Sequence, residues 1–388
     1  MIDLLLIILS CGAGDYINKA ILIGLFIVFV YQVAFRKRIL LNAIKSKALW
    51  FLTVFGLCFS VAGFGSIGEL KRFLVAPILM YLSGWVIAER RDFNQSSNAL
   101  DETIKRIVLS IVVGYSIHSL INYVVNIGRE RWLLIDYYTG SLRAATGLGM
   151  INTIAFSMIV YIGLERDLKR KLLASLCFII SVINGLQVGS RTQLLILLVV
   201  TVACLLFYFR EIDNAKGLKI TLISVVSLTF ILFFVYKTDF LGIYTKIEGS
   251  NLFYRLNADT SRVDGVRVER LVQGVFSLID HPFGNKSMLY FHNMWLDAGR
   301  IAGTLSFLLL AIYSFITYRN ALKIVFNKNL ELGFRILIFG IYLALFINYS
   351  VEPILEGMTE HFYVFCLING AIDCYYISLI RAKEYKDA

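Results

Sequence analysis

Long runs of apolar residues recur along the whole chain and are separated by short polar segments. Most runs have about 16 to 20 residues, close to the length that an α-helix needs to cross a hydrocarbon core about 30 Å thick. The pattern predicts twelve membrane-spanning helices, at residues 2–13, 17–35, 48–64, 73–88, 107–126, 145–164, 172–188, 193–209, 220–236, 294–317, 334–351 and 362–380. We therefore expect an all-α integral membrane protein in which residues 1–388 form a single polytopic membrane domain.

The first apolar run, 2–13, is shorter than the others and is followed by Gly14 and Asp15. No basic residue precedes it, so we do not expect a cleaved signal peptide. An alternative interpretation is an interfacial or re-entrant segment. That interpretation leaves eleven spans and places the N-terminus outside.

Composition supports a membrane protein, because 58% of the residues are hydrophobic and 17% are charged, against about 25% charged in soluble domains. A net charge of +11 would suggest a nucleic-acid partner in a soluble protein. With the N-terminus inside, however, the short inner segments carry 23 of the 38 Lys and Arg residues, as the positive-inside rule predicts. We expect both termini in the cytoplasm and no nucleic-acid partner.

Several patterns that can mark functional sites indicate structure here. The six cysteines lie in apolar runs without C-x-x-C spacing, which is typical of packing residues. Residues 63–68 match G-x-G-x-x-G, but they follow a membrane span and lack the strand-to-helix context of a nucleotide site. We interpret His118, within an apolar run, as a hydrogen-bonded packing residue. Because Asp, Glu and His do not cluster at ligand spacing, we expect no metal and no cofactor.

A long polar segment, 237–292, separates the ninth and tenth predicted spans and is expected to form a large outer loop with short amphipathic helices. Its segment 266–279 has apolar residues at helical spacing, namely Val268, Leu271, Val272, Val275, Phe276 and Ile279. This predicts a helix on the membrane surface that presents Arg267 and Arg270 to an anionic group. An ordinary interfacial helix, with its arginines on lipid headgroups, explains the pattern equally well.

Two more arginines lie at outer ends of predicted spans, where the positive-inside rule disfavours them. Arg143 precedes the sixth span, and Arg191 lies in the turn between the seventh and eighth spans. Charges at the membrane edge are costly and therefore indicate a function, although Arg191 could instead cap a helix.

The last outer loop, 352–361, contains Glu352, Glu356, Glu360 and His361 but no basic residue. It could shape a pocket for an acceptor sugar or supply a carboxylate base. It could equally be a solvated turn.

One group of motifs resembles the O-antigen polymerase and ligase superfamily of bacterial membrane glycan transferases. Arg267 lies fifteen residues before Pro282 in Asp280-His281-Pro282-Phe283-Gly284. The motif His292-Asn293-Met294-Trp295 follows, and its first residue, His292, lies eleven residues before Gly303. Gly189-Ser190-Arg191-Thr192 resembles the Ser-Arg-Thr turn of that superfamily. Two positions depart from the pattern, because Leu271 replaces a usual tryptophan and Arg300 lies in a usually apolar segment.

The resemblance implies an enzyme of the bacterial inner membrane that acts on the periplasmic side. It would polymerise undecaprenyl-pyrophosphate-linked oligosaccharide repeat units, without metal or cofactor, and membrane lipid and a chain-length regulator protein would be further partners. Transfer of glycan to lipid A-core by a ligase is the alternative, and a lipid-linked oligosaccharide flippase is a second one. The expected catalytic residues are His292, Arg191 and Arg267. The expected substrate-binding residues are Arg143, Arg270, Asn293, Glu352 and Glu356.

Overall fold

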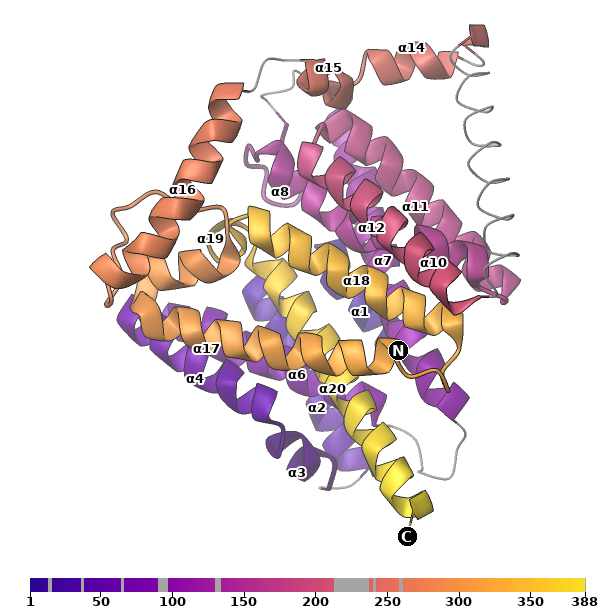
Figure 1. Ribbon diagram of the computed structural model, residues 1–388, viewed down its shortest axis with the longest axis vertical. Helices are drawn as coiled ribbons and strands as arrows, with labels where there is room; N and C mark the ends of the chain where they lie inside the picture. The colour runs from indigo at the N-terminus through magenta and orange to yellow at the C-terminus, as the bar shows by residue number, and fades with distance from the viewer. Residues whose placement is uncertain are drawn as a thin grey trace. The chain divides into compact units, whose positions relative to one another are not determined.

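The computed structural model describes residues 1–12, 16–35, 38–63, 66–89, 97–129, 134–212, 237–239, 242–257 and 261–387, and these residues form an almost entirely helical structure (Figure 1). The helices are α1 (Ile2–Cys11), α2 (Tyr16–Phe35), α3 (Arg38–Ile44), α4 (Lys47–Gly63), α5 (Ile67–Leu70), the π-helix η1 (Lys71–Val75), α6 (Ala76–Ala88), α7 (Ser97–Val125), α8 (Ala145–Gly149), the 3-10 helix η3 (Met150–Asn152), α9 (Thr153–Ser157), α10 (Ile159–Leu164), α11 (Leu168–Val188), α12 (Arg191–Glu211), α14 (Ile243–Glu248), α15 (Asn251–Asn257), α16 (Ser261–Asp280), α17 (Met294–Val325), α18 (Leu332–Val351), α19 (Ile354–Gly357) and α20 (Thr359–Asp387). The described residues contain no β-strand, which confirms the all-α fold class.

Eight helical segments within the described residues are long and apolar enough to cross a membrane. They are Gly68–Ala88, Leu100–Val125, Ala145–Leu164, Leu168–Val188, Arg191–Glu211, Met294–Val325, Leu332–Val351 and Thr359–Arg381. Shorter apolar helices, Ile2–Cys11, Asn18–Val30 and Lys47–Gly63, match the first three predicted spans. The ninth predicted span, 220–236, lies outside the described residues. The protein is therefore a multi-pass membrane protein by helix length and hydropathy.

The chain divides into two compact units. The first unit comprises Met1–Tyr115, Thr260–Leu330 and Leu345–Ala388, and the second comprises Ser116–Asp259 and Glu331–Ala344. Two of the four borders between them fall inside helices, one in α7 and one in α18. The single membrane domain stays a prediction.

In the first unit, glycines let helices pack with their backbones in contact. A methyl group at Gly84 of α6 would lie 1.9 Å from the carbonyl oxygen of Leu367 in α20, and one at Gly370 would lie 1.9 Å from that of Tyr81. Small residues at such crossings are typical of membrane helices, which associate through close packing. α17 packs along α4 in the same unit (Figure 1).

In the second unit, α9 packs against α11 and α12. A glycine again allows the closest contact, since a methyl group at Gly340 of α18 would lie 2.6 Å from the carbonyl oxygen of Ser157. The side chain of Arg335 forms a 2.9 Å ion pair with Glu211 in this unit. These contacts hold together α9, α11, α12 and α18, and Arg191 is the first residue of α12.

Candidate functional site

α16 separates its apolar residues from its arginines. Five large apolar side chains are 51–75% exposed and recur at helical spacing: Val268, Val272, Val275, Phe276 and Ile279. Gly274 and Ser277 on the other side are buried, and a methyl group at Gly274 would lie 3.0 Å from the ring of Phe291. Arg267 and Arg270 are partly buried. The helix predicted at 266–279 is confirmed. The observed helix, α16, is longer and runs from Ser261 to Asp280.

The turn after α16 fits into a break in α17. The backbone of α17 leaves helical geometry at Ala302 and Gly303, where Gly303 has a φ of 84°. A methyl group at Gly303 would lie 2.3 Å from the carbonyl oxygen of Pro282. The amide of Thr304 donates to that same oxygen at 2.9 Å. The Pro282-x-Gly284 motif and Gly303 therefore take part in the same backbone contact.

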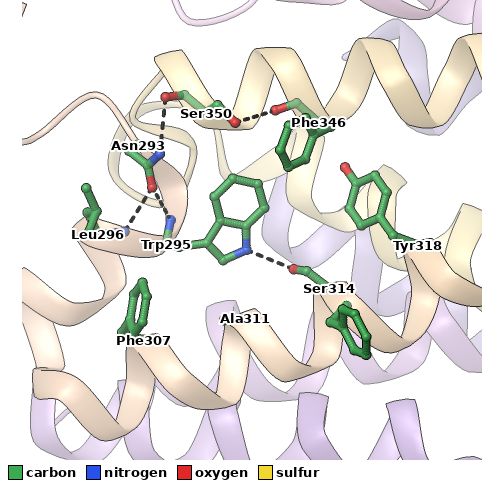
Figure 2. Close-up of a pocket in the computed structure, with 10 residues that line it drawn as sticks. Asn293, Trp295, Leu296, Phe307, Ala311, Ser314, Tyr318, Phe346 and Ser350 are labelled. Atoms are coloured by element: carbon green, nitrogen blue, oxygen red, sulfur yellow. Dashed lines mark hydrogen bonds between the residues drawn. The ribbon is translucent and has the colours of Figure 1, made fainter. Parts of the chain in front are cut away.

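The break folds the start of α17 back on the rest of it. The indole nitrogen of Trp295 donates to the hydroxyl of Ser314 at 2.9 Å, nineteen positions later (Figure 2). A straight helix would separate two residues nineteen positions apart by about 28 Å. The tenth predicted span, 294–317, is therefore interrupted, and the segment 304–325 that follows the break is long enough to cross a membrane.

The buried carboxylate of Asp297 holds the backbone on both sides of His292. One oxygen accepts from the amide of Phe291 at 2.7 Å, and the other accepts from the amide of Asn293 at 3.3 Å. His292 itself has a φ of 55°, a left-handed conformation that costs a residue other than glycine about 1–2 kcal/mol. The two hydrogen bonds to Asp297 therefore fix the backbone at the start of α17.

Asn293 links this backbone to the start of α17 and to α18. Its side-chain oxygen accepts from the amides of Trp295 and Leu296, each at 3.1 Å, and so caps the helix (Figure 2). Its side-chain nitrogen donates to the carbonyl oxygen of Ser350 at 3.2 Å. Asn293, predicted to bind substrate, therefore has a capping role in the described structure.

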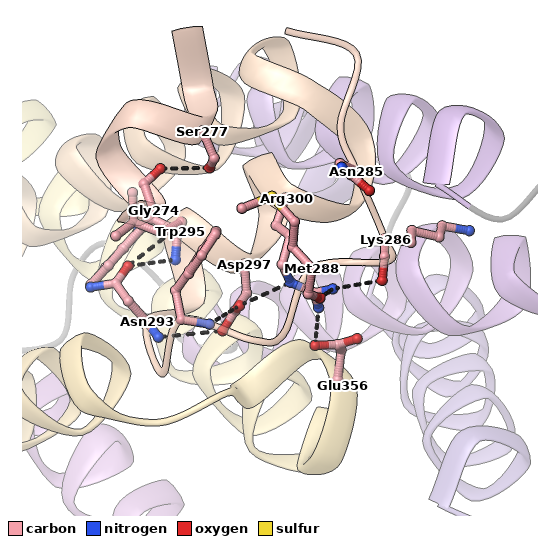
Figure 3. Close-up of polar contacts among 12 residues, drawn as sticks. Gly274, Ser277, Asn285, Lys286, Met288, Asn293, Trp295, Asp297, Arg300 and Glu356 are labelled. Atoms are coloured by element: carbon pink, nitrogen blue, oxygen red, sulfur yellow. Dashed lines mark hydrogen bonds and ion pairs between the residues drawn. The ribbon is translucent and has the colours of Figure 1, made fainter. Parts of the chain in front are cut away.

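Arg300 fastens the loop before α17 to two other elements (Figure 3). Its Nε donates to Asp297 Oδ1 at 3.3 Å, and one Nη donates to the carbonyl oxygen of Met288 at 3.0 Å. The other Nη pairs with the carboxylate of Glu356 in α19. Arg300 is 4% exposed, so its charge is balanced inside the protein.

Burial and the neighbouring positive charges keep the imidazole of His292 neutral. Burial, followed by the positive charges of Arg267 and Arg270, lowers the pKa of His292 to about 4. Its ring makes an edge contact with Tyr290 at 4.7 Å, and the guanidinium of Arg270 lies 5.9 Å from the Tyr290 ring centre. Among the described residues, His292 Nδ1 has no hydrogen-bond partner. The site therefore combines two cations with a neutral imidazole that can accept a proton.

The carboxylates of the segment 352–361 have different surroundings. The Glu356 side chain is 37% exposed and paired with Arg300. Glu352 is buried, and His361 Nδ1 lies 3.1 Å from the Tyr115 hydroxyl in a buried contact. Of the acidic residues predicted to bind substrate, Glu356 is thus linked to the backbone around His292 through Arg300 and Asp297.

Arg143 is in the second unit, where its Nε lies 3.3 Å from the buried carboxylate of Asp136. His118 Nε2 lies 3.9 Å from the same carboxylate, and its ring contacts that of Tyr137. Asn122 accepts from the amide of Tyr137 at 2.9 Å and so attaches this loop to α7. His118 is therefore buried beside a carboxylate, and Arg143 is tied to the same group.

Arg191 is also in the second unit, at the first position of α12. Gly189 before it has a φ of 70°, and a methyl group there would lie 2.8 Å from the backbone of Asn251 in α15. The turn that carries Arg191 is thus packed against the first residue of α15. Its catalytic role stays a prediction.

The structure brings Arg267, Arg270 and His292 together in the first unit, with Asn293 adjacent. The sequence interpretation missed Asp297 as a site residue and treated Arg300 as a departure. An acidic and a basic residue three positions apart in an apolar segment could have identified the pair, because such charges are costly there. In the described part of the chain, no three His, Cys, Asp or Glu side chains are grouped so that they could hold a metal ion.

No protein-family model matches the chain, and no curated protein matches its sequence.

Proposed function

We propose that this protein transfers a glycan from an undecaprenyl-pyrophosphate carrier to an acceptor hydroxyl, and that it polymerises oligosaccharide repeat units in this way. The observation that carries the proposal is the group formed by Arg267 and Arg270 of α16 with the neutral His292 just before α17, where Tyr290 contacts both Arg270 and His292. Guanidinium groups bind phosphate oxygens through paired hydrogen bonds and stay charged throughout. A neutral imidazole can take the proton of an attacking hydroxyl.

In the proposed reaction the acceptor oxygen forms a bond to the anomeric carbon of the donor sugar. The bond between that carbon and the pyrophosphate oxygen breaks, and its electron pair stays on the leaving group. Arg267 and Arg270 stabilise the added negative charge, while the acceptor proton moves to His292. Electrostatic stabilisation by one well-placed donor is worth about 10²- to 10³-fold in rate.

The proposal includes a twelve-span topology with both termini in the cytoplasm and 237–292 outside. The basic residues of the short inner segments support this orientation. The exposed apolar stripe of α16 suits a helix that lies on the outer membrane surface with Arg267 and Arg270 turned away from the lipid. Reporter fusions at about residue 260 and at the C-terminus should report opposite compartments, and the same compartment for both would contradict the topology.

Purified protein in liposomes, supplied with a lipid-linked repeat unit, tests the activity directly. We expect Arg267→Ala to lower glycan transfer about 100-fold or more, and Arg267→Lys to restore little because an ammonium is a point charge. Arg319→Ala, which removes an exposed arginine at the far part of α17, is the matched control and should transfer normally. Wild-type rates from both Arg267 variants would refute the assigned role.

The proton acceptor is tested separately. His292→Ala should lose nearly all transfer, since a positioned base contributes about 10²- to 10⁴-fold. Chelator should leave the wild-type rate unchanged if transfer needs no metal. Loss of activity with chelator that added metal restores would refute the metal-free reaction.

A ligase reaction, with lipid A-core as acceptor, would use the same groups. Supplying each acceptor in turn separates the two activities, since a polymerase lengthens the lipid-linked chain and a ligase does not. A flippase would move the donor across the membrane without any new glycosidic bond, which mass spectrometry of the product detects.

A further inference from the structure

α17 and α18 of the first unit line a pocket of about 530 Å³ beside the site (Figure 2). Its walls are mainly apolar and aromatic, and they include Trp295, Phe307, Ala311, Tyr318 and Phe346. The volume lies within the range of pockets that hold small ligands, about 300–1,000 Å³. It belongs to helices that are long and apolar enough to lie in a membrane.

Polar groups line the same pocket where it meets the site. Asn293 and Ser350 are both part of its wall, and they are joined by a 3.2 Å hydrogen bond. Asn293 directly follows His292, whose pKa is lowered by burial and then by the positive charges of Arg267 and Arg270. The pocket therefore begins beside a cationic group and continues between apolar helices. A molecule that fits both parts has an anionic head and a hydrocarbon tail.

We propose that this pocket binds the polyprenyl chain of the lipid-linked donor beyond its first isoprene unit. The inference rests on the proposed function, because the pyrophosphate of that donor would occupy the adjoining cationic group. The rings of Trp295, Phe307, Tyr318 and Phe346 give a rigid, irregular wall that suits a methyl-branched chain. The fold-back of α17 forms one side of this wall, since the Trp295–Ser314 hydrogen bond fixes the indole there.

The pocket contributes to the binding of the donor in a different way from a hydrophobic pocket in a soluble protein. Lipid tails are as apolar as the pocket, so transfer from the bilayer contributes little, and close packing provides the contact energy. The main effect is that a tail held in the pocket raises the effective concentration of its own head at the arginines. The pocket should therefore influence the KM for a long-chain donor and have no influence on a donor too short to reach it.

Ala311→Trp tests the inference because an indole at this position fills the middle of the pocket. Leu305→Trp is the matched control, since Leu305 is exposed on the same helix and does not line the pocket. Each variant is assayed in liposomes with a donor on a long polyprenyl chain and with one on a single isoprene unit. Gel filtration and thermal unfolding verify that both variants are folded.

We expect Ala311→Trp to raise KM for the long-chain donor about tenfold and to leave KM for the single-isoprene donor unchanged. Leu305→Trp should change neither value. An unchanged KM for the long-chain donor, or an equal rise for both donors, would overturn the assignment. A wild-type KM that follows the acyl-chain length of the surrounding phospholipid and not the donor chain would show a phospholipid in the pocket, which also overturns it.

The result expected if the proposed function is wrong differs from the result expected if only the pocket assignment is wrong. If the proposed function is wrong, wild-type protein makes no glycan with either donor. Binding of polyprenyl pyrophosphate alone, measured by competition against a labelled long-chain probe, then still tests the pocket. Weaker binding to Ala311→Trp than to Leu305→Trp would support it, and equal binding to both would refute it.

Discussion

The carboxylate of Asp297 should control whether His292 is held in its working position. Asp297→Asn keeps the size of the side chain but replaces one oxygen with an N–H₂ group. Whichever way the amide turns, one of the two backbone amides, that of Phe291 or that of Asn293, loses its acceptor. A buried donor left without a partner costs about 1–3 kcal/mol. The substitution also removes the negative charge beside the buried guanidinium of Arg300.

These contributions can be compared with the strain at His292. Hydrogen bonds to a charged group contribute about 1.5–3 kcal/mol each, so the intact pair exceeds the cost of about 1–2 kcal/mol of the left-handed conformation. With one bond lost, the remaining bond no longer clearly exceeds that cost. We expect Asp297→Asn to lower the free energy of unfolding by about 2–4 kcal/mol and to release the His292 backbone.

The assays are thermal unfolding of purified protein and glycan transfer in liposomes. If His292 is the proton acceptor, Asp297→Asn should lower the rate about 100-fold or more in protein that is still folded at the assay temperature. Asp280→Asn, a neutralisation of an exposed aspartate at the end of α16, should change neither property. A wild-type unfolding temperature together with wild-type transfer by Asp297→Asn would refute the reasoning.

Three further predictions concern the contacts around the site. Gly303→Ala should destabilise the protein, because the new methyl group meets the Pro282 carbonyl at 2.3 Å in a left-handed conformation, whereas Gly163→Ala, which meets nothing within 4 Å, should not. Arg143→Gln should lower the unfolding temperature by leaving Asp136 buried without that guanidinium, and should reduce transfer less than Arg267→Ala does. The value of kcat/KM should fall as the pH is lowered through about 4, because His292 has a pKa of about 4 and its protonation removes the base. A fall in kcat/KM already at pH 6–7 would exclude His292 as the base.

Sequence patterns predicted the apolar helices well because membrane helices are apolar over a length that the bilayer sets. α11 and α12 lie within a few residues of their predicted limits for this reason. α7 begins ten residues before its predicted start, in a polar segment that the pattern could not assign to a span. There the hydroxyl of Tyr375 reaches the buried carboxylate of Asp101, 274 positions away in the sequence.

The candidate site was only partly predictable. The amphipathic spacing located α16 with Arg267 and Arg270, since a period of 3.6 residues is visible locally. The break in α17 was not visible, because a single glycine in an apolar run is compatible with a continuous helix. What breaks the helix is the Pro282 turn, which docks there through tertiary contacts. Arg300 was interpreted as a departure because it lies in a usually apolar segment, and its partner Glu356, 56 positions away, could not be identified from the sequence.

Arg300 differs from Arg267 and Arg270, and the difference explains why only the last two are assigned to substrate. Arg300 is buried, and Asp297 and Glu356 balance its charge, so it serves the protein's own structure. Arg267 and Arg270 are partly exposed, and in the part of the chain whose side chains are described neither forms an ion pair. Their field instead acts on His292, where it adds to burial, the larger cause, in lowering the pKa of the imidazole. An anion bound between them would cancel that field and raise the proton affinity of the imidazole. Donor binding would thereby strengthen the base at the moment when the acceptor hydroxyl needs one, which couples the two halves of the proposed reaction.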